Sequence, residues 1–309
     1  MTSLMALRRG GLGDLLVALP AVRLLRMSLP EARITLVARP IFGRLFLDSG
    51  IVDAVADADD FRWAALAGAD GLPKRLIADP AEIDLAAGWF HSPSAAVFER
   101  GAAGLWPGAR ILTVSADPSA GRPLSVSFFE GTAAGLRNLG LPSAPFESCA
   151  FLPRPPGLTG VPALGRPYAV VHPGAGSRLK RWPGGRFQQA VRSLAASGLS
   201  GAVVLGEAES SLKAEWIARV LPPGWLLLDR PAVPELAALL SGASLYLGND
   251  SGVTHLAAVL GVPGAAVFRE EFAGAWHPGG KIAQVSAADV RDISVEAVLS
   301  SLDLPAGQA

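Results

Sequence analysis

The sequence contains a single cysteine, Cys149, among 309 residues. One thiol can form neither a disulfide within the chain nor a cysteine-based zinc cluster, so we expect Cys149 to be a buried side chain without a chemical role. The chain also lacks a charge excess, because 27 basic residues balance 27 acidic ones. No strong basic field is available to attract nucleic acid, and we expect no nucleic acid partner.

Long apolar runs are missing as well. No uncharged apolar stretch is long enough to span a bilayer. The amino terminus lacks the unbroken apolar core of a signal peptide, because Arg8, Arg9 and Asp14 interrupt it. The sequence therefore predicts a soluble, cytoplasmic protein.

What the chain does have is an alternation of strand and helix patterns, which occurs twice. We expect strands near 4–8, 33–38, 51–55, 83–86, 110–114, 168–172, 201–205, 225–228, 244–247, 264–268 and 282–285. Helices are expected between them, near 13–27, 40–48, 93–104 and 127–139 in the first half, and at the end from Val290 to Leu302. Such alternation is typical of α/β folds with mainly parallel sheets and ligands at the carboxyl ends of the strands.

A stretch rich in proline and glycine separates the two halves and predicts an interdomain linker. We therefore expect an amino-terminal domain at 1–152, a linker at 153–167, a carboxyl-terminal domain at 168–290, and a final helix and tail at 291–309.

The most informative segment runs from Leu245 to Phe268 and predicts a strand, a polar loop, a helix and another strand. In the loop, Asp250 or Ser251 can cap the helix, and Gly252 leaves the backbone open to a ligand. Free amides and the helix dipole make such a point suitable for phosphate. The alternative is an ordinary capped helix.

A second segment follows the predicted strand Tyr168–His172 and reads Pro-Gly-Ala-Gly-Ser-Arg-Leu-Lys-Arg-Trp-Pro. Gly174 and Gly176 permit turns that place amides around a ligand, and Lys180 adds positive charge. Pro183 suits the first turn of the helix that follows. The spacing fits neither the phosphate loop of NTPases nor the dinucleotide fingerprint, which excludes a standard NTPase or NAD site.

A third segment, Arg9-Gly-Gly-Leu-Gly-Asp14, forms a predicted strand-to-helix turn at the amino terminus. A carboxylate at this point can face a cleft at the carboxyl edge of the sheet. From its position alone, Asp14 is more readily explained as a helix cap.

Taken together, these three segments resemble glycosyltransferase family 9, the bacterial ADP-heptose:lipopolysaccharide heptosyltransferase family. The resemblance extends from Leu4 to about Asp292, and it is weakest from about Phe61 to Ala150. It implies the GT-B architecture, in which two Rossmann-like domains face each other across a cleft. It also implies an inverting, metal-independent transfer of heptose from ADP-heptose to a lipopolysaccharide-type or other glycan acceptor, without a cofactor.

The resemblance assigns roles to individual residues. Asp14 is implied as the general base, beside an acceptor-side loop that includes Gly11 and Gly13, and Lys180 as the phosphate-binding lysine. The remaining donor contacts implied are Gly174, Gly176, Ser177, Asp250, Ser251, Gly252 and His255. A ribose-binding glutamate is expected after strand 201–205, where Glu209 is preferred over Glu207. Peripheral contact with the inner face of the cytoplasmic membrane is compatible with a glycolipid acceptor.

Two patterns suggest a metal and are set aside. Asp57 and Asp59 have the D-x-D spacing of metal-dependent glycosyltransferases, but no nucleotide-binding loop follows them. His91, His172 and His277 are too scattered along the chain to predict a zinc site. Positive side chains and helix ends can stabilise a departing diphosphate without a metal.

Two alternatives to a heptosyltransferase remain open at this level. The chain could hold a nucleotide sugar without transferring it, although such a binder would not need Asp14. It could also be a GT-B sugar-nucleotide epimerase, which the three segments fit poorly. Arg269, Glu270 and Glu271 replace the glycine-containing turn that often follows the last strand of the family motif, which leaves the sugar and the base of the donor open.

Overall fold

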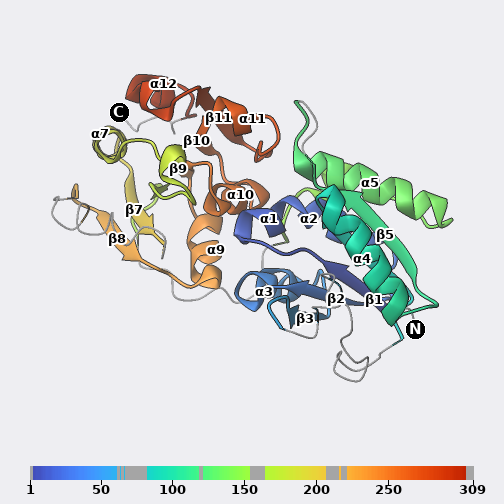
Figure 1. Ribbon diagram of the computed structural model, residues 1–309. Helices are drawn as coiled ribbons and strands as arrows, with labels where there is room; N and C mark the ends of the chain where they lie inside the picture. Colours follow the sequence, from blue (N-terminus) through green and yellow to red (C-terminus); the bar gives the residue numbers. More distant parts are fainter. Residues whose placement is uncertain are drawn as a thin grey trace. The chain divides into compact units, whose positions relative to one another are not determined.

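The computed structural model describes residues 3–60, 63, 66, 82–117, 121–153, 164–206, 216 and 221–303. The chain divides into two compact units, which we call unit 1 (Met1–Pro156) and unit 2 (Gly157–Ala309), and each contains its own sheet (Figure 1). The division falls within the stretch predicted as a linker.

Unit 1 is built on a five-stranded sheet with the order β3-β2-β1-β4-β5, and all of its strand pairs are parallel. The strands are β1 Ser3–Leu7, β2 Arg33–Ala38, β3 Ala54–Asp57, β4 Leu85–Phe90 and β5 Arg110–Ser115. The helices are α1 Leu12–Val17, α2 Leu19–Ser28, α3 Pro40–Asp48, α4 Ser92–Leu105, α5 Leu124–Asn138 and α6 Phe146–Cys149.

Unit 2 is built on a six-stranded parallel sheet with the order β11-β10-β9-β6-β7-β8. The strands are β6 Tyr168–His172, β7 Ser200–Leu205, β8 Trp225–Asp229, β9 Leu245–Asn249, β10 Gly264–Arg269 and β11 Ile282–Ala287. The described helices are η3 Arg178–Lys180, α7 Gly184–Ala196, α9 Val233–Ser241, α10 Gly252–Val259, α11 Glu270–Ala273, η5 Val290–Asp292 and α12 Val295–Ser300.

The central strands are apolar along their whole length because they are covered on both faces. Every residue of β6 and of β9 is buried, as are five of the six residues of β4. Strands of this kind appear in a sequence as continuous apolar runs rather than as alternating patterns. This explains why the predicted strands match the observed ones to within a few residues.

The order of the strands reverses once in each sheet. In unit 1 the reversal lies between β1 and β4, and in unit 2 it lies between β6 and β9. Open parallel sheets bind ligands outside the carboxyl ends of the strands at such switch points. The four loops that leave β1, β4, β6 and β9 are therefore the first places to search for function.

Two predicted helix positions differ from the structure, and a third has the expected interruption. The helix pattern at 13–27, which Pro20 was expected to break, is divided into α1 and α2 at Ala18, because Pro20 can occupy only the first turn of a helix. The single helix expected from Val290 to Leu302 is interrupted by Ser294, whose side chain caps α12. Pro183 is the N-cap of α7 and not a residue of its first turn.

Candidate functional site

The loop after β6 carries the predicted phosphate-binding residues. Ser177 begins the short helix η3 by accepting a hydrogen bond from the amide of Leu179, and Lys180 ends that helix. Neither Gly174 nor Gly176 has a positive φ, so a strained turn does not explain these glycines. Gly176 instead borders open space, with no atom within 4 Å of the position that a Cβ would occupy. Its backbone therefore stays accessible to a ligand.

The loop after β9 leads directly into α10. Ser251 is the N-cap, and its Oγ accepts a hydrogen bond from the amide of Thr254. Gly252 is the first residue of the helix. The predicted cap is thus Ser251, which leaves the neighbouring carboxylate of Asp250 for another partner.

That partner is Lys180. Its Nζ lies 2.6 Å from Oδ2 of Asp250, which brings together two residues that are 70 positions apart and that the sequence assigned to one donor site. Asp250 is buried, with 5% of its side chain exposed, and Lys180 keeps 23%. Burial raises the pKa of the Asp250 carboxyl from its ordinary value, and the charge of Lys180 opposes this change.

Aromatic rings complete the environment of Lys180. The ammonium group lies 4.3 Å from the centroid of Phe272 and 6.0 Å from that of Trp276. Both rings come from the chain after β10, where the sequence departs from the family pattern. A cation over an aromatic face is stabilised by the ring quadrupole. The α11 segment therefore contributes to holding Lys180, a role that the sequence did not reveal.

Asn249 is a second residue that sequence reasoning missed. It is fully buried, its Oδ1 accepts from the amide of Trp182 at 3.0 Å, and its Nδ2 donates to the carbonyl of Pro173 at 2.9 Å. These bonds tie the loop after β6 to the end of β9. A buried amide with partners on both sides fixes the two loops in one register, which places Lys180 opposite Asp250.

His255 lies on α10 and is buried, with 3% exposure. Its Nε2 has no hydrogen-bond partner among the described residues. Burial, with smaller contributions from the charges of Lys180 and His277, lowers the pKa of His255 to about 4. The imidazole is therefore neutral at pH 7, and it can offer a ligand a hydrogen bond but no charge.

Asp14 lies in unit 1 at the start of α1. Its Oδ2 accepts from the amide of Gly11 at 2.9 Å, and its Oδ1 pairs with Nη2 of Arg8 at 3.0 Å. About a third of the Asp14 side chain stays exposed, whereas Arg8 is buried and also donates to the carbonyl of Trp89. Burial lowers the pKa of Arg8, and Asp14 counteracts that effect. Asp14 thus caps a helix and also reaches the carboxyl edge of the sheet.

Gly10 explains why this loop is rich in glycine. It has a φ of +125°, and a Cβ there would lie 2.6 Å from the carboxyl carbon of Asp14. Any side chain at position 10 would therefore displace Asp14. Gly11 supplies the N-cap position and Gly13 lies inside α1, so neither has this constraint.

The other positions that the sequence analysis considered have different partners from the residues around Lys180 and Asp14. Asp59 forms an ion pair with Arg39 at 3.1 Å, and its amide donates to Asp57. His172 contacts the carbonyl of Val204 inside the core. Among the described residues, no group of three or more potential metal ligands comes together. Glu207 and Glu209 lie outside the described residues.

Two further features of the described residues are a cavity in unit 2 and the lack of a membrane-spanning helix. A cavity of about 280 Å³ lies at the carboxyl end of β8, with lining residues that include Asp229, Arg230 and Glu235. No helix in the described ranges is both long and apolar enough to cross a membrane.

Solved structures identify the class of protein first. Escherichia coli heptosyltransferase WaaC with ADP is similar over 97% of this chain and 98% of that chain, with a TM-score of 0.72 and 18% identity. A glycosyltransferase family 9 protein from Veillonella parvula gives a TM-score of 0.75 at 15% identity, over 97% of this chain and 95% of that chain. At these identities the similarity concerns the fold, which is the GT-B architecture of two parallel-sheet α/β domains.

Sequence comparison then gives the family. The profile described as glycosyltransferase family 9 (heptosyltransferase) matches residues 143–295, about half of the chain. Lipopolysaccharide heptosyltransferase 3 of Escherichia coli is 29% identical over 134 residues, which is 42% of this chain. The match spans 39% of the length of that relative. The chain belongs to glycosyltransferase family 9.

Proposed function

We propose that this protein transfers heptose from ADP-heptose to a lipopolysaccharide-type acceptor. The observation that carries the proposal is the meeting of Lys180 and Asp250 at the switch point of unit 2. A lysine, a buried carboxylate and a helix start at one sheet edge can bind a diphosphate and a sugar hydroxyl together. Membership of a heptosyltransferase family supports heptose as the sugar.

In the proposed complex the diphosphate of the donor lies between the loop after β6 and the start of α10. Lys180 turns from Asp250 toward the phosphates, and the amides near Ser251 and Gly252 donate to them. Asp250, released from Lys180, accepts a hydrogen bond from a hydroxyl of the donor sugar. The neutral imidazole of His255 donates to a phosphate oxygen. A glutamate after β7, preferably Glu209, holds the ribose.

The chemical step is a single inverting displacement. The acceptor hydroxyl attacks the anomeric carbon, its proton passes to Asp14, and the bond from that carbon to the diphosphate breaks. The diphosphate leaves with the electron pair, and Lys180 and the helix amides stabilise its charge. A general base accepts the proton as the new bond forms, and Asp14 reaches the sheet edge where it can do so.

Calorimetry with ADP tests the proposed donor site. Lys180→Ala should weaken ADP binding by about 1–3 kcal/mol, the usual scale for losing a charge-assisted contact. Lys281→Ala, which removes an exposed lysine of the same unit, is the matched control and should bind normally. An absence of binding between the parent chain and any nucleoside diphosphate would refute the proposal. The anomeric configuration of the product, read by NMR, tests inversion.

One observation favours a second function. Both oxygens of Asp14 already have partners, Arg8 and Gly11, as a purely structural cap would. A protein that binds a nucleotide sugar without transferring it would show normal ADP affinity and no transfer. Assaying transfer and binding on the same preparation distinguishes the two functions.

A further inference from the structure

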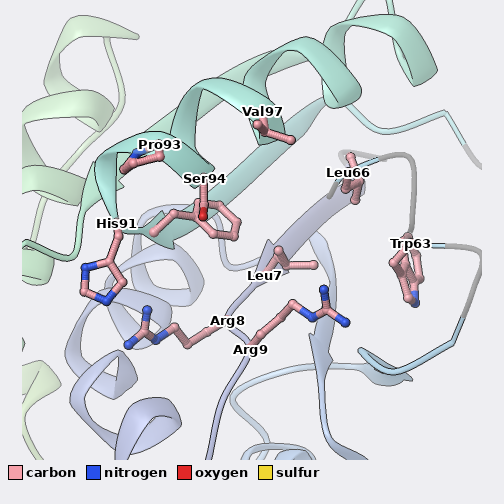
Figure 2. A pocket seen from close by; sticks show the side chains of 10 residues that line it. Leu7, Arg8, Arg9, Trp63, Leu66, His91, Pro93, Ser94 and Val97 are labelled. Atoms are coloured by element: carbon pink, nitrogen blue, oxygen red, sulfur yellow. The ribbon is translucent and has the colours of Figure 1, made fainter. Parts of the chain in front are cut away.

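The carboxylate proposed to bind the donor sugar is already occupied by Lys180. Oδ2 of Asp250 lies 2.6 Å from the ammonium nitrogen, but this ion pair lacks the geometry of a hydrogen bond, and the buried oxygen has no hydrogen-bond donor among the described residues. One cavity, of about 380 Å³, lies in unit 1 beside Arg9 and His91 (Figure 2), and another lies at the end of β8. Neither includes the pair. A sugar hydroxyl therefore reaches Asp250 by displacing the ammonium group.

Two aromatic rings also contact this ammonium group. Nζ of Lys180 lies 4.3 Å from the centroid of Phe272 and 6.0 Å from that of Trp276, and both rings are only partly buried. They follow Arg269–Glu271, where the chain departs from the pattern of its family. The negative face of an aromatic ring attracts cations, and it also attracts polarised C–H groups. The ammonium group thus lies beside both a carboxylate and an aromatic face.

The segment that carries these rings is fixed on the sheet. The side-chain amide of Gln284, on β11, donates to the carbonyl of Ala273 at 2.9 Å, and the backbone amide of Trp276 donates to the carbonyl of Phe272 at 3.0 Å. The ring of Trp276 packs edge-on against the imidazole of His255, with centroids 6.1 Å apart. These contacts do not involve the ammonium group, so the rings are held independently of it.

A carboxylate beside an aromatic face suits a sugar ring. The carboxylate accepts hydrogen bonds from hydroxyl groups, and the aromatic ring packs against the C–H face of the sugar. When Lys180 moves to the phosphates of free ADP, Asp250 is left buried without a partner, which is costly. When the ligand is a nucleotide sugar, the sugar replaces the ammonium group and removes that cost.

We propose that the sugar of the donor takes the place of the Lys180 ammonium group against Asp250 and Phe272, so that the site discriminates a nucleotide sugar from the free nucleoside diphosphate. Phe272 contacts the sugar and is a specificity-determining residue. After transfer, Asp250 pairs with Lys180 again, which favours release of the diphosphate. The proposal relies on the proposed function for Lys180 binding the diphosphate and Asp250 the sugar.

Calorimetry with ADP and with ADP-heptose, on the full chain and without an acceptor, tests this exchange. Asp250→Asn removes the partner that holds Lys180, so we expect ADP to bind about tenfold more tightly, as it does when a competing state that dominates is removed. The same variant should not bind ADP-heptose more tightly, because the sugar loses its carboxylate. The preference for ADP-heptose over ADP should therefore fall by at least about tenfold.

A double-variant cycle separates the exchange from the charge of Asp250 itself. Removal of a carboxylate near a diphosphate lowers repulsion whether or not Lys180 is present. Release of Lys180 strengthens binding only in a chain that contains it. Asp250→Asn should therefore strengthen ADP binding more in the parent than in Lys180→Met, and the difference measures the exchange. Equal gains in the two backgrounds would contradict it.

Phe272→Leu keeps an apolar side chain but removes the ring face. We expect it to weaken the binding of ADP-heptose about three- to tenfold and to leave that of ADP within about twofold of the parent. Phe272→Tyr keeps the ring and should bind both ligands as the parent does. Phe151→Leu, at an exposed ring of unit 1, is the matched control and should change neither affinity.

The inference is wrong if Phe272→Leu weakens both ligands by the same factor, or if the preference for ADP-heptose over ADP is absent in the parent or unchanged in Asp250→Asn. Failure of the proposed function would instead appear as a lack of ADP binding by the parent chain. The two results are therefore distinguishable. Thermal unfolding of each variant shows whether a change of affinity reflects a loss of fold.

Discussion

Asp14 shows at the scale of one residue how a cap and a base can coincide. Its side chain closes the first turn of α1 through Gly11 and balances the buried charge of Arg8. The same contacts orient the carboxylate toward the sheet edge. Position in the sequence favoured a cap and the family resemblance favoured a base, and the observed geometry accommodates both.

Asp14→Asn separates the two roles. Asparagine keeps the size and one acceptor oxygen, so the variant should fold, with a loss of about 1–3 kcal/mol because Arg8 loses its counter-charge. It cannot take a proton, and kcat should fall about 10²–10⁴-fold while ADP affinity stays near normal. Steady-state kinetics and calorimetry on one preparation measure both. A variant that transfers sugar at the parent rate would leave Asp14 as a cap alone.

His255 gives a prediction for stability against pH. The unfolded imidazole binds a proton near pH 6.5, whereas the folded one does so only near pH 4, because burial disfavours its charged form. The contribution of His255 to the free energy of unfolding is therefore fully present above pH 6.5. It is lost as the pH falls toward 4, by on the order of 1–3 kcal/mol. Denaturant unfolding of the parent and of His255→Gln over this range should show the difference. Parallel curves for the two proteins would contradict the prediction.

At the scale of elements, the proposed donor site depends on contacts between the loop after β6 and the end of β9. Asn249 bonds the loop after β6, and Trp182 anchors the start of α7 through its indole bond to the carbonyl of Ile293. The α11 segment adds aromatic faces to Lys180. The position of Lys180 is therefore set by several elements, which is why its loop sequence alone did not determine its partner.

Lys180→Met tests the ion pair between these loops. Burial raises the pKa of Asp250 in the folded protein above its ordinary value of 3.8. The folded protein therefore favours the neutral carboxyl, and this contribution to stability is fully present below pH 3.8 and is lost as the pH rises through the pKa of the folded state. Without Lys180 that loss should grow, to about 3–5 kcal/mol at neutral pH, the usual cost of leaving a buried charge unpaired.

The control for this prediction is the double variant Lys180→Met with Asp250→Asn. It has no carboxylate at position 250, so its stability should not show the loss at neutral pH that is expected for Lys180→Met alone. Urea unfolding of the parent, the single variant and the double variant at several pH values provides the comparison. If the single variant loses the same stability at every pH, the pair does not contribute as described.

At the scale of the whole molecule, the proposed donor contacts all come from unit 2 and the proposed base comes from unit 1. Transfer therefore requires both units, whereas most of the affinity for the nucleotide should come from unit 2. In unit 1 the same switch-point topology positions Asp14, Arg9 and His91 at one sheet edge.

Metal independence is the prediction at this scale. The leaving diphosphate should be stabilised by Lys180 and the amides of α10, so sugar transfer should survive an excess of EDTA. A time course of product formation with and without the chelator measures this. Complete loss of turnover, restored by magnesium or manganese, would instead support a metal and return attention to Asp57 and Asp59.

Strand patterns were predictable because central parallel strands are buried on both faces. β2, β6 and α3 were placed at their observed bounds. A helix boundary differs from the prediction where a side-chain cap interrupts an apolar period, as Ser294 does at the start of α12. Lys180, Asp250 and Asp14 each follow a predicted strand, where parallel sheets gather their ligands, and the family resemblance assigned their roles.

The sequence by itself determined that strands and helices alternate in both halves of the chain. It also determined the loops after β1, β6 and β9 and the types of residue in them, because these depend on local pattern and on the order of the strands. The tertiary structure decided which side chains are partners: Lys180 with Asp250, Asn249 with the loop after β6, and Arg8 with Asp14. It also formed the cavity beside His91. Contacts of this kind join residues far apart in the chain, and their distances follow from packing, which no local pattern encodes.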